Sequence, residues 1–390
     1  MDIARKTAEI IAYVTDLRRH FHEHPEPGMR EFATTRRVIE ELRKLPGMEV
    51  RDTAPGCIGV LRGKYPGKAI ALRADLDALP LVEESGLPFA SKTPGVCHAC
   101  GHDLHTAILI GVATVLASLN GEFGGAVTFI FQPGQELFMG ARYMIDKGAL
   151  DAPKVDAIIG LHTWPLTPVG SIGLKRGPMM ASLDTIDILV SGKAGHAAQP
   201  HRAVDAIFMA GHIITALQGI VSRETDPLES LVVALGTVNG GTFRNIIAPE
   251  VRLEGSVRTH SAAVRDAVPQ KIRDVISGVT AAFGGTAELE YTRCAPPLIN
   301  DDAMLDVIEA AAAAVIGRER ITALPLPVMG AEDFSCYLEH VPGAFFRLGT
   351  AADDSQTQLV PHDPRIRYDE KAIPVGINVL CRAALDYCAM

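Results

Sequence analysis

The sequence has no long uninterrupted apolar run and no excess of basic charge. No run approaches the ~18 consecutive apolar residues that a membrane-spanning helix needs, and residues 1–6 have neither the basic start nor the apolar stretch of a signal peptide. The formal net charge is −9, whereas proteins that bind phosphate backbones present a basic face. We therefore expect neither a membrane nor a nucleic acid as partner.

A disulfide framework and internal repeats are also lacking. The seven cysteines are an odd number and are scattered over 390 residues, which is typical of free thiols in a reducing cytoplasm. No repeated or low-complexity segment is present. A chain of this length exceeds one ordinary hydrophobic core, so we expect two domains.

Apolar runs alternate with a helical pattern in the first half of the chain. Residues 68–75, 126–131 and 155–161 predict buried strands, and residues 105–119 predict a helix. This alternation predicts an α/β domain with a central, mostly parallel sheet. Functional side chains collect where the strands of such sheets end. The polar residues at or just after these ends are Asp75, Asp77, Gln135, Glu136 and His162.

A different order of elements follows between residues 182 and 294. Four strands and two helices are expected in the order β-α-β-β-α-β, which is that of the ferredoxin-like unit. In chain order they are 183–190, 203–220, 231–238, 251–258, 262–283 and 287–292. The α/β pattern then resumes. We therefore predict a discontinuous catalytic domain, residues 1–181 and 295–390, with an inserted domain of residues 182–294.

Candidate metal ligands occur at the ends of several of these segments. One glycine separates Cys100 from His102, and Glu136, His162 and His362 follow farther along. Divalent ions such as Zn²⁺ take thiolate, imidazole and carboxylate ligands, and paired ions hold both the attacking and the leaving oxygen of a hydrolysis. The pattern indicates a metal-dependent hydrolase.

Several of these residues also have simpler explanations. A histidine after a strand is more often a hydrogen-bonded core residue than a ligand, which applies to His162 and His362 taken singly. Asp75, Asp77 and His105 would be alternate ligands or would orient the ligands. The two aspartates would equally suit caps of the segments that follow them.

The ordered motifs resemble the M20 metallopeptidase family. The resemblance is to the amidohydrolase branch, which contains hippurate hydrolases, N-acyl-amino-acid amidohydrolases and auxin-conjugate hydrolases. The matching segments extend over almost the whole chain. They are residues 18–26, 72–80, 98–105, 131–133, 160–162, 195–201, 245–247 and 330–334, and the segment around His362.

The resemblance implies a two-metal catalytic domain with an inserted lid and dimerisation domain. It implies two divalent ions (Mn, Zn, Co or Ni) bound by Cys100, His102, Glu136, His162 and His362. In the family, the histidine that matches His196 reaches the active site of the partner subunit and stabilises the oxyanion. Asn245 matches a contact to the substrate carboxylate, and we place Arg258 near it. The simpler explanations are a polar turn residue for His196 and a solvent-facing strand end for Arg258.

Position 135 departs from the family pattern of two adjacent glutamates, a general base and then a metal ligand. The pair here is Gln135 and Glu136. An amide cannot take up a proton near neutral pH, and a general base contributes ~10²–10⁴-fold in rate. We favour an engineered Glu→Gln substitution. The alternative is a natural variant that is weakly active, uses another base or only binds its ligand.

We expect the chain to hydrolyse the amide bond of N-acyl or N-aroyl amino acids as a cytoplasmic homodimer or homotetramer. Residue 135, as Glu, would be the base, Asp77 would orient a metal ligand, and His196 would hold the oxyanion. One alternative is a dipeptidase or aryl-amide hydrolase of the same family. Residues 137–139 would then shape an acyl pocket or merely pack on the sheet. The other is a non-catalytic protein that binds amino-acid conjugates.

Overall fold

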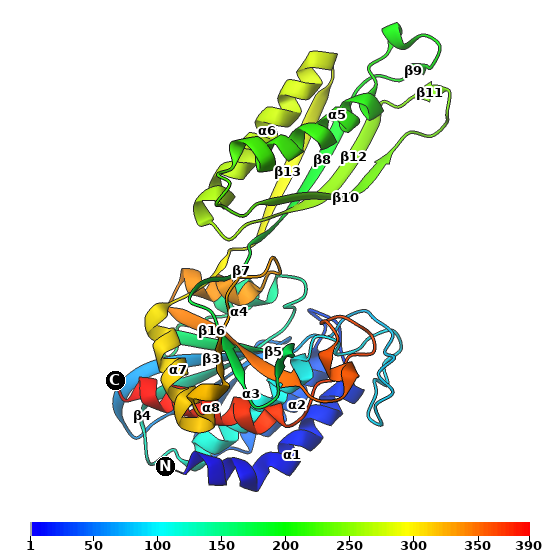
Figure 1. Cartoon of the computed structure of the whole chain (residues 1–390). Helices are drawn as coiled ribbons and strands as arrows, with labels where there is room; N and C mark the ends of the chain where they lie inside the picture. Colours follow the sequence, from blue (N-terminus) through cyan, green and yellow to red (C-terminus); the bar gives the residue numbers. More distant parts are fainter. Residues whose placement is uncertain (1) are drawn as a thin grey trace. The chain divides into compact units, whose positions relative to one another are not determined.

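The computed structural model describes residues 2–390, and its contacts divide them into two compact units (Figure 1). Unit 1 contains the chain up to Gly177 together with Ile299–Leu326 and Cys336–Met390, and unit 2 contains Pro178–Leu298 and Pro327–Ser335. The last segment was expected in the catalytic domain. It belongs to unit 2 because its backbone bonds there: Val328 N–H donates to the Met179 carbonyl at 3.1 Å.

Unit 1 is built on an eight-stranded sheet in the order β1-β2-β4-β3-β5-β16-β6-β15. The neighbours β4, β3, β5 and β16 pair in parallel, whereas β1, β2 and β6 add antiparallel pairings. The mostly parallel sheet that the alternating pattern predicted is therefore confirmed. The strands are β1 (Met48–Asp52), β2 (Cys57–Arg62), β3 (Tyr65–Asp75), β4 (Gly124–Gln132), β5 (Ala157–Pro168), β6 (Ile172–Leu174), β15 (Ile321–Ala323) and β16 (Gly343–Ala351).

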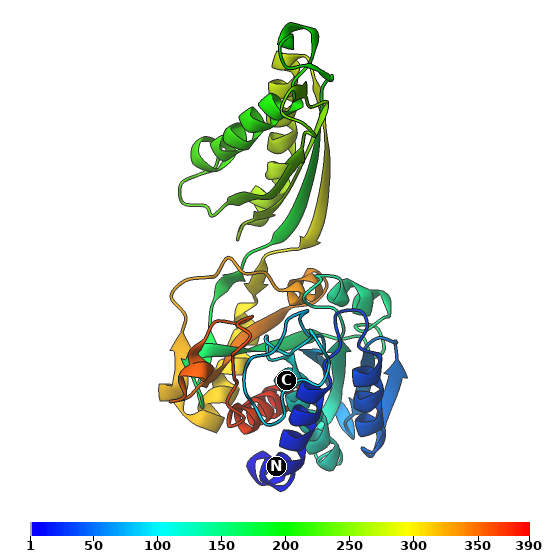
Figure 2. The ribbon, with the colours of Figure 1, turned by 90° about the vertical axis from the view of Figure 1, so that its right-hand side faces the viewer.

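Helices pack on this sheet through apolar side chains. α3 contacts α1, α8 and the strands β3 and β5, and it is buried along nearly its whole length (Figures 1 and 2). Its sequence is apolar on all sides, as expected of a helix that is covered all round. The helices of unit 1 are α1 (Ile3–Glu23), α2 (Phe32–Arg43), α3 (His102–Ser118), α4 (Gly140–Asp146), α7 (Asp302–Ile316) and α8 (Ala372–Cys388).

Unit 2 has the β-α-β-β-α-β order that the sequence predicted. Its four strands form an antiparallel sheet in the order β10-β12-β8-β13, and a separate short pair joins β9 to β11. One face of the sheet packs with the helices around its own apolar core. The elements are β8 (Leu183–Ser191), β9 (Gly195–His196), α5 (Ala206–Gly219), β10 (Val232–Gly240), β11 (Ile246–Ile247), β12 (Glu250–Arg258), α6 (Ala262–Phe283) and β13 (Thr286–Ala295).

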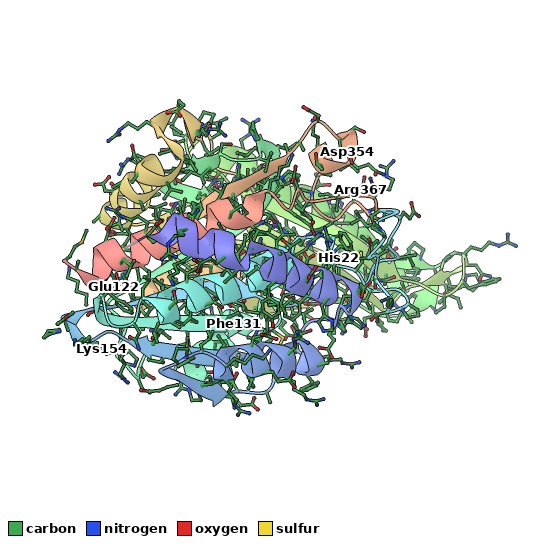
Figure 3. The ribbon with its side chains drawn as sticks, turned by 90° about the horizontal axis from the view of Figure 1, so that it is seen from below. His22, Glu122, Phe131, Lys154, Asp354 and Arg367 are labelled. Carbon is green, nitrogen blue, oxygen red and sulfur yellow. The ribbon has the colours of Figure 1, made fainter. Side chains whose placement is uncertain are left out.

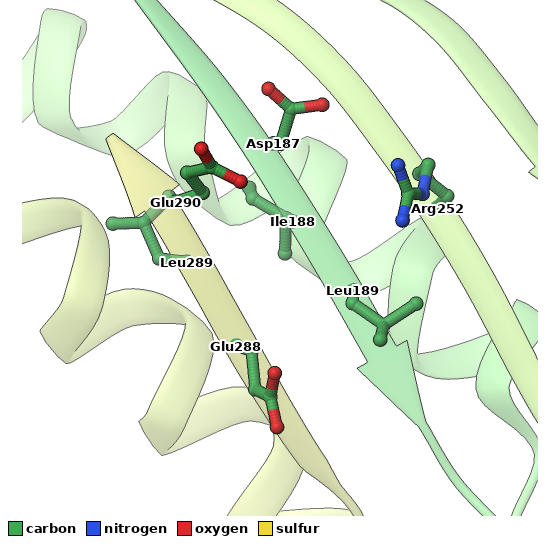
Figure 4. Close-up of a pocket in the computed structure, with 7 residues that line it drawn as sticks. All are labelled: Asp187, Ile188, Leu189, Arg252, Glu288, Leu289 and Glu290. Carbon is green, nitrogen blue, oxygen red and sulfur yellow. The ribbon is translucent and has the colours of Figure 1, made fainter. Parts of the chain in front are cut away.

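The other face of this sheet is polar. Figure 4 shows a hollow there, and its lining includes Asp187, Glu288, Glu290 and Arg252. β8 residues on this face alternate with buried ones, for example Asp187 with Ile188, which is the pattern of a half-buried strand. None of the candidate metal ligands lies on this face.

One helical stretch of unit 2 is unusually apolar. Residues Ala206–Glu224 are long and apolar enough to cross a membrane by length and composition, a test that core helices of other proteins also pass. Ile207 and Phe208 on α5 are each 51% exposed. Phe208 packs against Phe283 at a ring-centroid distance of 4.9 Å, so part of this apolar surface is covered within unit 2.

Candidate metal centre

The structure brings the five predicted metal ligands together in unit 1. Cys100, His102 and His162 form one group whose ligand atoms all lie within 4.8 Å of one another, and Cys100, Glu136 and His362 form a second. Because the thiol belongs to both groups, a thiolate at this position could bridge two ions. A third group, Asp75, His102 and His105, shares the His102 imidazole.

The donor atoms of this cluster fit divalent cations. His102 Nε2 and Glu136 Oε1 are buried and lack a hydrogen-bond partner among residues 2–390. Glu136 Oε1 lies 4.0 Å from His102 Nε2 and 3.3 Å from His362 Nε2, while Cys100 Sγ lies 3.4 Å from His162 Nε2. A buried polar atom without a partner costs about 1–3 kcal/mol. Cations shared among these thiol, imidazole and carboxylate groups would remove that cost.

A left-handed glycine places the first two ligands. Gly101 has φ of 82° and ends the loop that leads into α3. A Cβ atom at this position would lie 2.4 Å from Thr163 Oγ1, which is closer than real contacts allow. Only glycine therefore fits between Cys100 and His102, and the helix then begins with the His102 side chain in the cluster.

Asp77 contacts two of the candidate ligands. His102 Nδ1 lies 3.1 Å from Asp77 Oδ1 and 2.9 Å from the Asp77 carbonyl oxygen, so it is the donor nitrogen and Nε2 is left to face the cluster. The second carboxylate oxygen, Oδ2, accepts a 2.9 Å hydrogen bond from the Glu136 backbone N–H. One carboxylate thus orients an imidazole ligand and the loop that carries a carboxylate ligand.

His105 is fully hydrogen-bonded. The Thr163 N–H donates to His105 Nε2 at 2.9 Å, so Nδ1 carries the proton and donates to Asp75 Oδ1 at 2.6 Å. Asp75 Oδ2 also accepts from Arg73 at 2.6 Å. With both nitrogens engaged, His105 supports the cluster through Asp75 and Thr163. This arrangement favours the orienting role for His105 over the role of an alternate ligand.

The last candidate ligand comes from a strained turn. His362 has φ of 73°, a region that non-glycine residues adopt rarely. Its N–H donates to the Ala99 carbonyl at 3.0 Å, which anchors this distant segment beside Cys100. Backbone strain of this kind collects at functional sites.

A buried ionic network lies behind the cluster. Asp103, which follows His102 on α3, forms an ion pair with Arg18 at 2.8 Å and contacts His22 Nδ1 at 2.8 Å. Figure 3 labels His22, which projects from α1. His22 Nε2 reaches Glu83 at 3.1 Å. The network ties α1 to the first turn of α3, and so fixes the position of His102.

The charges of neighbouring side chains lower the pKa of the two carboxyl groups of the cluster, Asp75 and Glu136. Burial disfavours the charge of Asp75, but the neighbouring His102, His105 and Arg73 outweigh it and hold the pKa of that carboxyl well below its usual range. Burial likewise opposes a charge on Glu136, yet the His362 imidazole, 3.3 Å away, and the charge of His102 lower its pKa. Both carboxylates are therefore ionised at neutral pH.

The thiol and the second histidine have the opposite balance. Burial raises the pKa of the Cys100 thiol, and the charge of Glu136 adds to the effect. Burial lowers the pKa of His162 to about 3, with a further contribution from His105. His162 is thus neutral, as a metal ligand must be, whereas Cys100 would lose its proton when a cation binds.

Gln135 immediately precedes Glu136 in the loop after β4. It is 5% exposed, and its side chain makes no hydrogen bond within residues 2–390. The adjoining Gly134 N–H donates at 2.7 Å to Glu31, a buried carboxyl whose pKa is raised to about 7 by burial and by the charge of Asp77. Sequence analysis missed Glu31, because its partners are far away along the chain.

Two of the three residues after this pair are exposed, and Phe138 between them is half-buried. Leu137 is 51% exposed and Met139 is 56% exposed. Phe138 between them adopts φ of 55°. The turn thus presents two apolar side chains on the surface of the loop that carries Glu136, where they are available to an apolar group of a ligand.

The predicted lid residues lie in unit 2, and only two of them are neighbours. His196 pairs with Ile246 across β9 and β11, and the Asn245 carbonyl accepts a 3.0 Å bond from Ala197 N–H. Arg258 ends β12 at the far end of the sheet and donates to the Met329 carbonyl at 3.0 Å. The structure therefore does not bring Arg258 together with Asn245.

This arrangement defines the site of a metal-dependent hydrolase, and comparison with known proteins agrees. Residues 71–386 match the family model for peptidase family M20/M25/M40. The N-acetylcysteine deacetylase of Bacillus subtilis (strain 168) is 40% identical over 373 residues, which are 95% of each chain. The N-acyl-L-amino acid amidohydrolase of Geobacillus stearothermophilus is 42% identical over 303 residues, which are 77% of this chain and 81% of that protein.

A protein of known structure with the same fold binds two metal ions. The YXEP protein of Bacillus subtilis, a dinuclear metal binding peptidase from the M20 family, has a TM-score of 0.85 and 36% identity, covering 98% of this chain and 99% of that one. The chain therefore belongs to the M20 family, as the motifs predicted. It is a metal-dependent amidohydrolase with the two-domain M20 fold.

Proposed function

We propose that this chain binds N-acyl or N-aroyl amino acids, and that its Gln135→Glu form hydrolyses their amide bond to a carboxylic acid and a free amino acid. The observation that carries the proposal is the pair of ligand groups sharing Cys100. Relatives named for the deacetylation of N-acetylcysteine and the hydrolysis of N-acyl-L-amino acids support the substrate class. The two exposed apolar side chains, Leu137 and Met139, suit an acyl or aroyl group.

Two divalent ions would be held by Cys100, His102, Glu136, His162 and His362. Mn, Zn, Co and Ni ions all accept this set of ligands. When bound, such ions polarise a carbonyl and lower the pKa of water towards ~7. Asp77 would keep His102 Nε2 directed at the site. His196 of the partner subunit would hold the oxyanion, and Asn245 would contact the substrate carboxylate.

Residue 135 decides whether the site turns over. A glutamate there would take the proton of the attacking water and pass it to the leaving amine. The amide of Gln135 cannot, so the chain as it stands would be inactive or impaired. We favour an engineered substitution, because the surrounding ligand set is intact. The second candidate function is a non-catalytic binding protein for amino-acid conjugates, which Gln135 itself favours.

Hydrolysis of N-acetyl, N-benzoyl and dipeptide substrates with added Mn²⁺ or Zn²⁺ tests these proposals. We expect Gln135→Glu to raise the rate by ~10²–10⁴-fold. A second change in that variant, Glu136→Gln, should abolish the gain by removing a metal ligand. Equal rates for the starting chain and Gln135→Glu would refute the role of residue 135. Turnover of dipeptides alone would favour a dipeptidase, and binding without turnover by either form would favour the binding protein.

We also propose a cytoplasmic homodimer formed through unit 2, two of which could assemble into a homotetramer. β10 is an edge strand, and edge strands pair readily with another chain. Val238 on β10 is 57% exposed, and the apolar Ile207 and Phe208 of α5 are each 51% exposed. Light scattering should give a dimer or tetramer mass for the starting chain and a monomer mass for Phe208→Glu. A monomer for the starting chain would contradict the proposal.

A further inference from the structure

Arg347 is a buried cation without an acidic partner among the described residues. It lies in the middle of β16, where every neighbour in the run Gly343–Thr350 is uncharged, and only 7% of it is exposed. Within residues 2–390 its side chain makes no hydrogen bond and no ion pair. Burial lowers the pKa of Arg347 to about 10, so the guanidinium stays charged at neutral pH.

The other deeply buried arginines differ from Arg347 in this respect. Arg18 pairs with Asp103 at 2.8 Å, Arg73 with Asp75 at 2.6 Å and Arg265 with Asp184 at 2.7 Å. Even the more exposed Arg367 pairs with Asp354 at 3.3 Å, and Figure 3 shows the two side by side. A buried charge is normally paired, because its desolvation is otherwise uncompensated.

Arg347 lies beside the metal cluster. It is the register partner of His162 on the parallel strand β5, and partners in parallel strands point to the same face of a sheet. Two residues after His162 on that face comes Trp164. The Arg347 guanidinium carbon lies 3.7 Å from the centre of the Trp164 ring, and that ring meets His162 edge-on at a centroid distance of 6.3 Å.

Stacking on the indole leaves the guanidinium able to bind an anion. The cation–π contact uses the flat face of the group, whereas its five N–H donors lie in its plane and match a carboxylate in two-point geometry. The Trp164 indole also holds the guanidinium in one orientation, which lowers the entropy lost on binding.

We propose that Arg347, held by Trp164, is a carboxylate-recognising group of the substrate site, placed beside the metal ligand His162. The inference rests on the proposed function and narrows it: preferred substrates carry a carboxylate that reaches this guanidinium. That carboxylate is either the α-carboxylate of the amino acid or one on its side chain.

The test measures ligand binding to the chain as it stands, loaded with Mn²⁺ or Zn²⁺. The ligands are N-acetylglycine, N-acetylglutamate and the uncharged N-acetylglycinamide. Their binding is measured by calorimetry and by the fluorescence of Trp164, the single tryptophan of the chain. Arg347→Met removes the charge at similar length, and Arg347→Lys keeps it. Arg176→Met is the matched control, because Arg176 is a half-exposed arginine of unit 1 that already pairs with Asp306.

We expect Arg347→Met to weaken binding of the carboxylates about 10- to 100-fold and to leave N-acetylglycinamide unchanged. Arg347→Lys should recover part of the loss, and Arg176→Met should bind as the starting chain does. A loss for both carboxylates identifies the α-carboxylate, and a loss for N-acetylglutamate alone identifies the side-chain carboxylate. The carboxylates should also change the Trp164 emission, and Arg347→Met should abolish that change.

Two results would overturn the inference. One is equal binding of the carboxylates by the starting chain and Arg347→Met, which would leave the proposed function intact. The other is an equal loss for the charged and uncharged ligands, which would reduce Arg347 to a packing role. If the starting chain binds none of the three ligands, the proposed substrate class fails and the inference fails with it.

Discussion

Asp77→Asn should weaken metal binding although it changes only one atom of the side chain. The two carboxylate oxygens of Asp77 each face a donor: Oδ1 faces His102 Nδ1 at 3.1 Å, and Oδ2 faces the Glu136 N–H at 2.9 Å. An asparagine has one oxygen and one NH₂ group. Whichever way the amide turns, its NH₂ group meets a donor, so one of the two contacts is lost.

The expected cost follows from these contacts. The Asp77 carbonyl still accepts from His102 Nδ1 at 2.9 Å, so the imidazole keeps its tautomer and the amide turns its oxygen towards Glu136 or His102 but not both. Loss of a partner that orients a ligand typically reduces metal affinity by ~10–100-fold. The unpaired buried donor should also lower the free energy of unfolding by about 1–3 kcal/mol.

Titration with Mn²⁺ or Zn²⁺ against a competing chelator measures the affinity, and urea unfolding of the metal-free protein measures the stability. Asp156→Asn is the matched control. Asp156 accepts a single backbone bond, from Ala69 N–H at 2.8 Å, which an asparagine oxygen can keep. Unchanged metal affinity in Asp77→Asn, or an equal fall in Asp156→Asn, would refute the argument that Asp77 orients the ligands.

Three further predictions follow from the same geometry. Gly101→Ala should lower the free energy of unfolding in urea by about 1–3 kcal/mol, because the new Cβ meets Thr163 at 2.4 Å. Gly121→Ala, where nothing lies within 4 Å of the new Cβ, should leave it unchanged. Equal effects of the two substitutions would contradict the requirement for glycine at position 101. Burial and the charge of Asp77 raise the pKa of Glu31 from 4.5 to about 7, so the folded state binds more protons than the unfolded state and the free energy of unfolding falls as pH rises between these two values. Glu31→Gln should remove up to about 3 kcal/mol of that fall. An unchanged dependence of stability on pH in Glu31→Gln would refute this prediction. Divalent metal at about 100 times its Kd should stabilise the folded chain by about 2.7 kcal/mol, less so in Cys100→Ser, and a melting temperature that does not respond to metal would count against the site.

The sequence predicted those features that depend on residues close together in the chain. The helix predicted at 262–283 is α6 (Ala262–Phe283), and the strand predicted at 68–75 lies within β3, whose buried part begins at Ala69. The apolar period of these segments is set by which face is covered, and that can be seen in the residues themselves. The five candidate metal ligands were named from motifs, and the structure brings their donor atoms together.

Long-range contacts were beyond such patterns. Pro327–Ser335 joins unit 2 through backbone bonds to partners far away along the chain, and Arg258 lies at the opposite end of the sheet from Asn245, which no local period predicts. Glu31 showed no signal, because its burial and its contact with Gly134 arise only when the chain folds.

Neighbouring residues account for the types of element, the family motifs and the chemistry of the candidate ligands. Which polar groups share a buried space depended on contacts between segments far apart in the chain. The tertiary structure left Arg347 without an acid and placed it on Trp164 beside His162, because strands β16 and β5 pair in parallel with a particular register. Register is a property of two distant segments together, and it sets which side chains face the site.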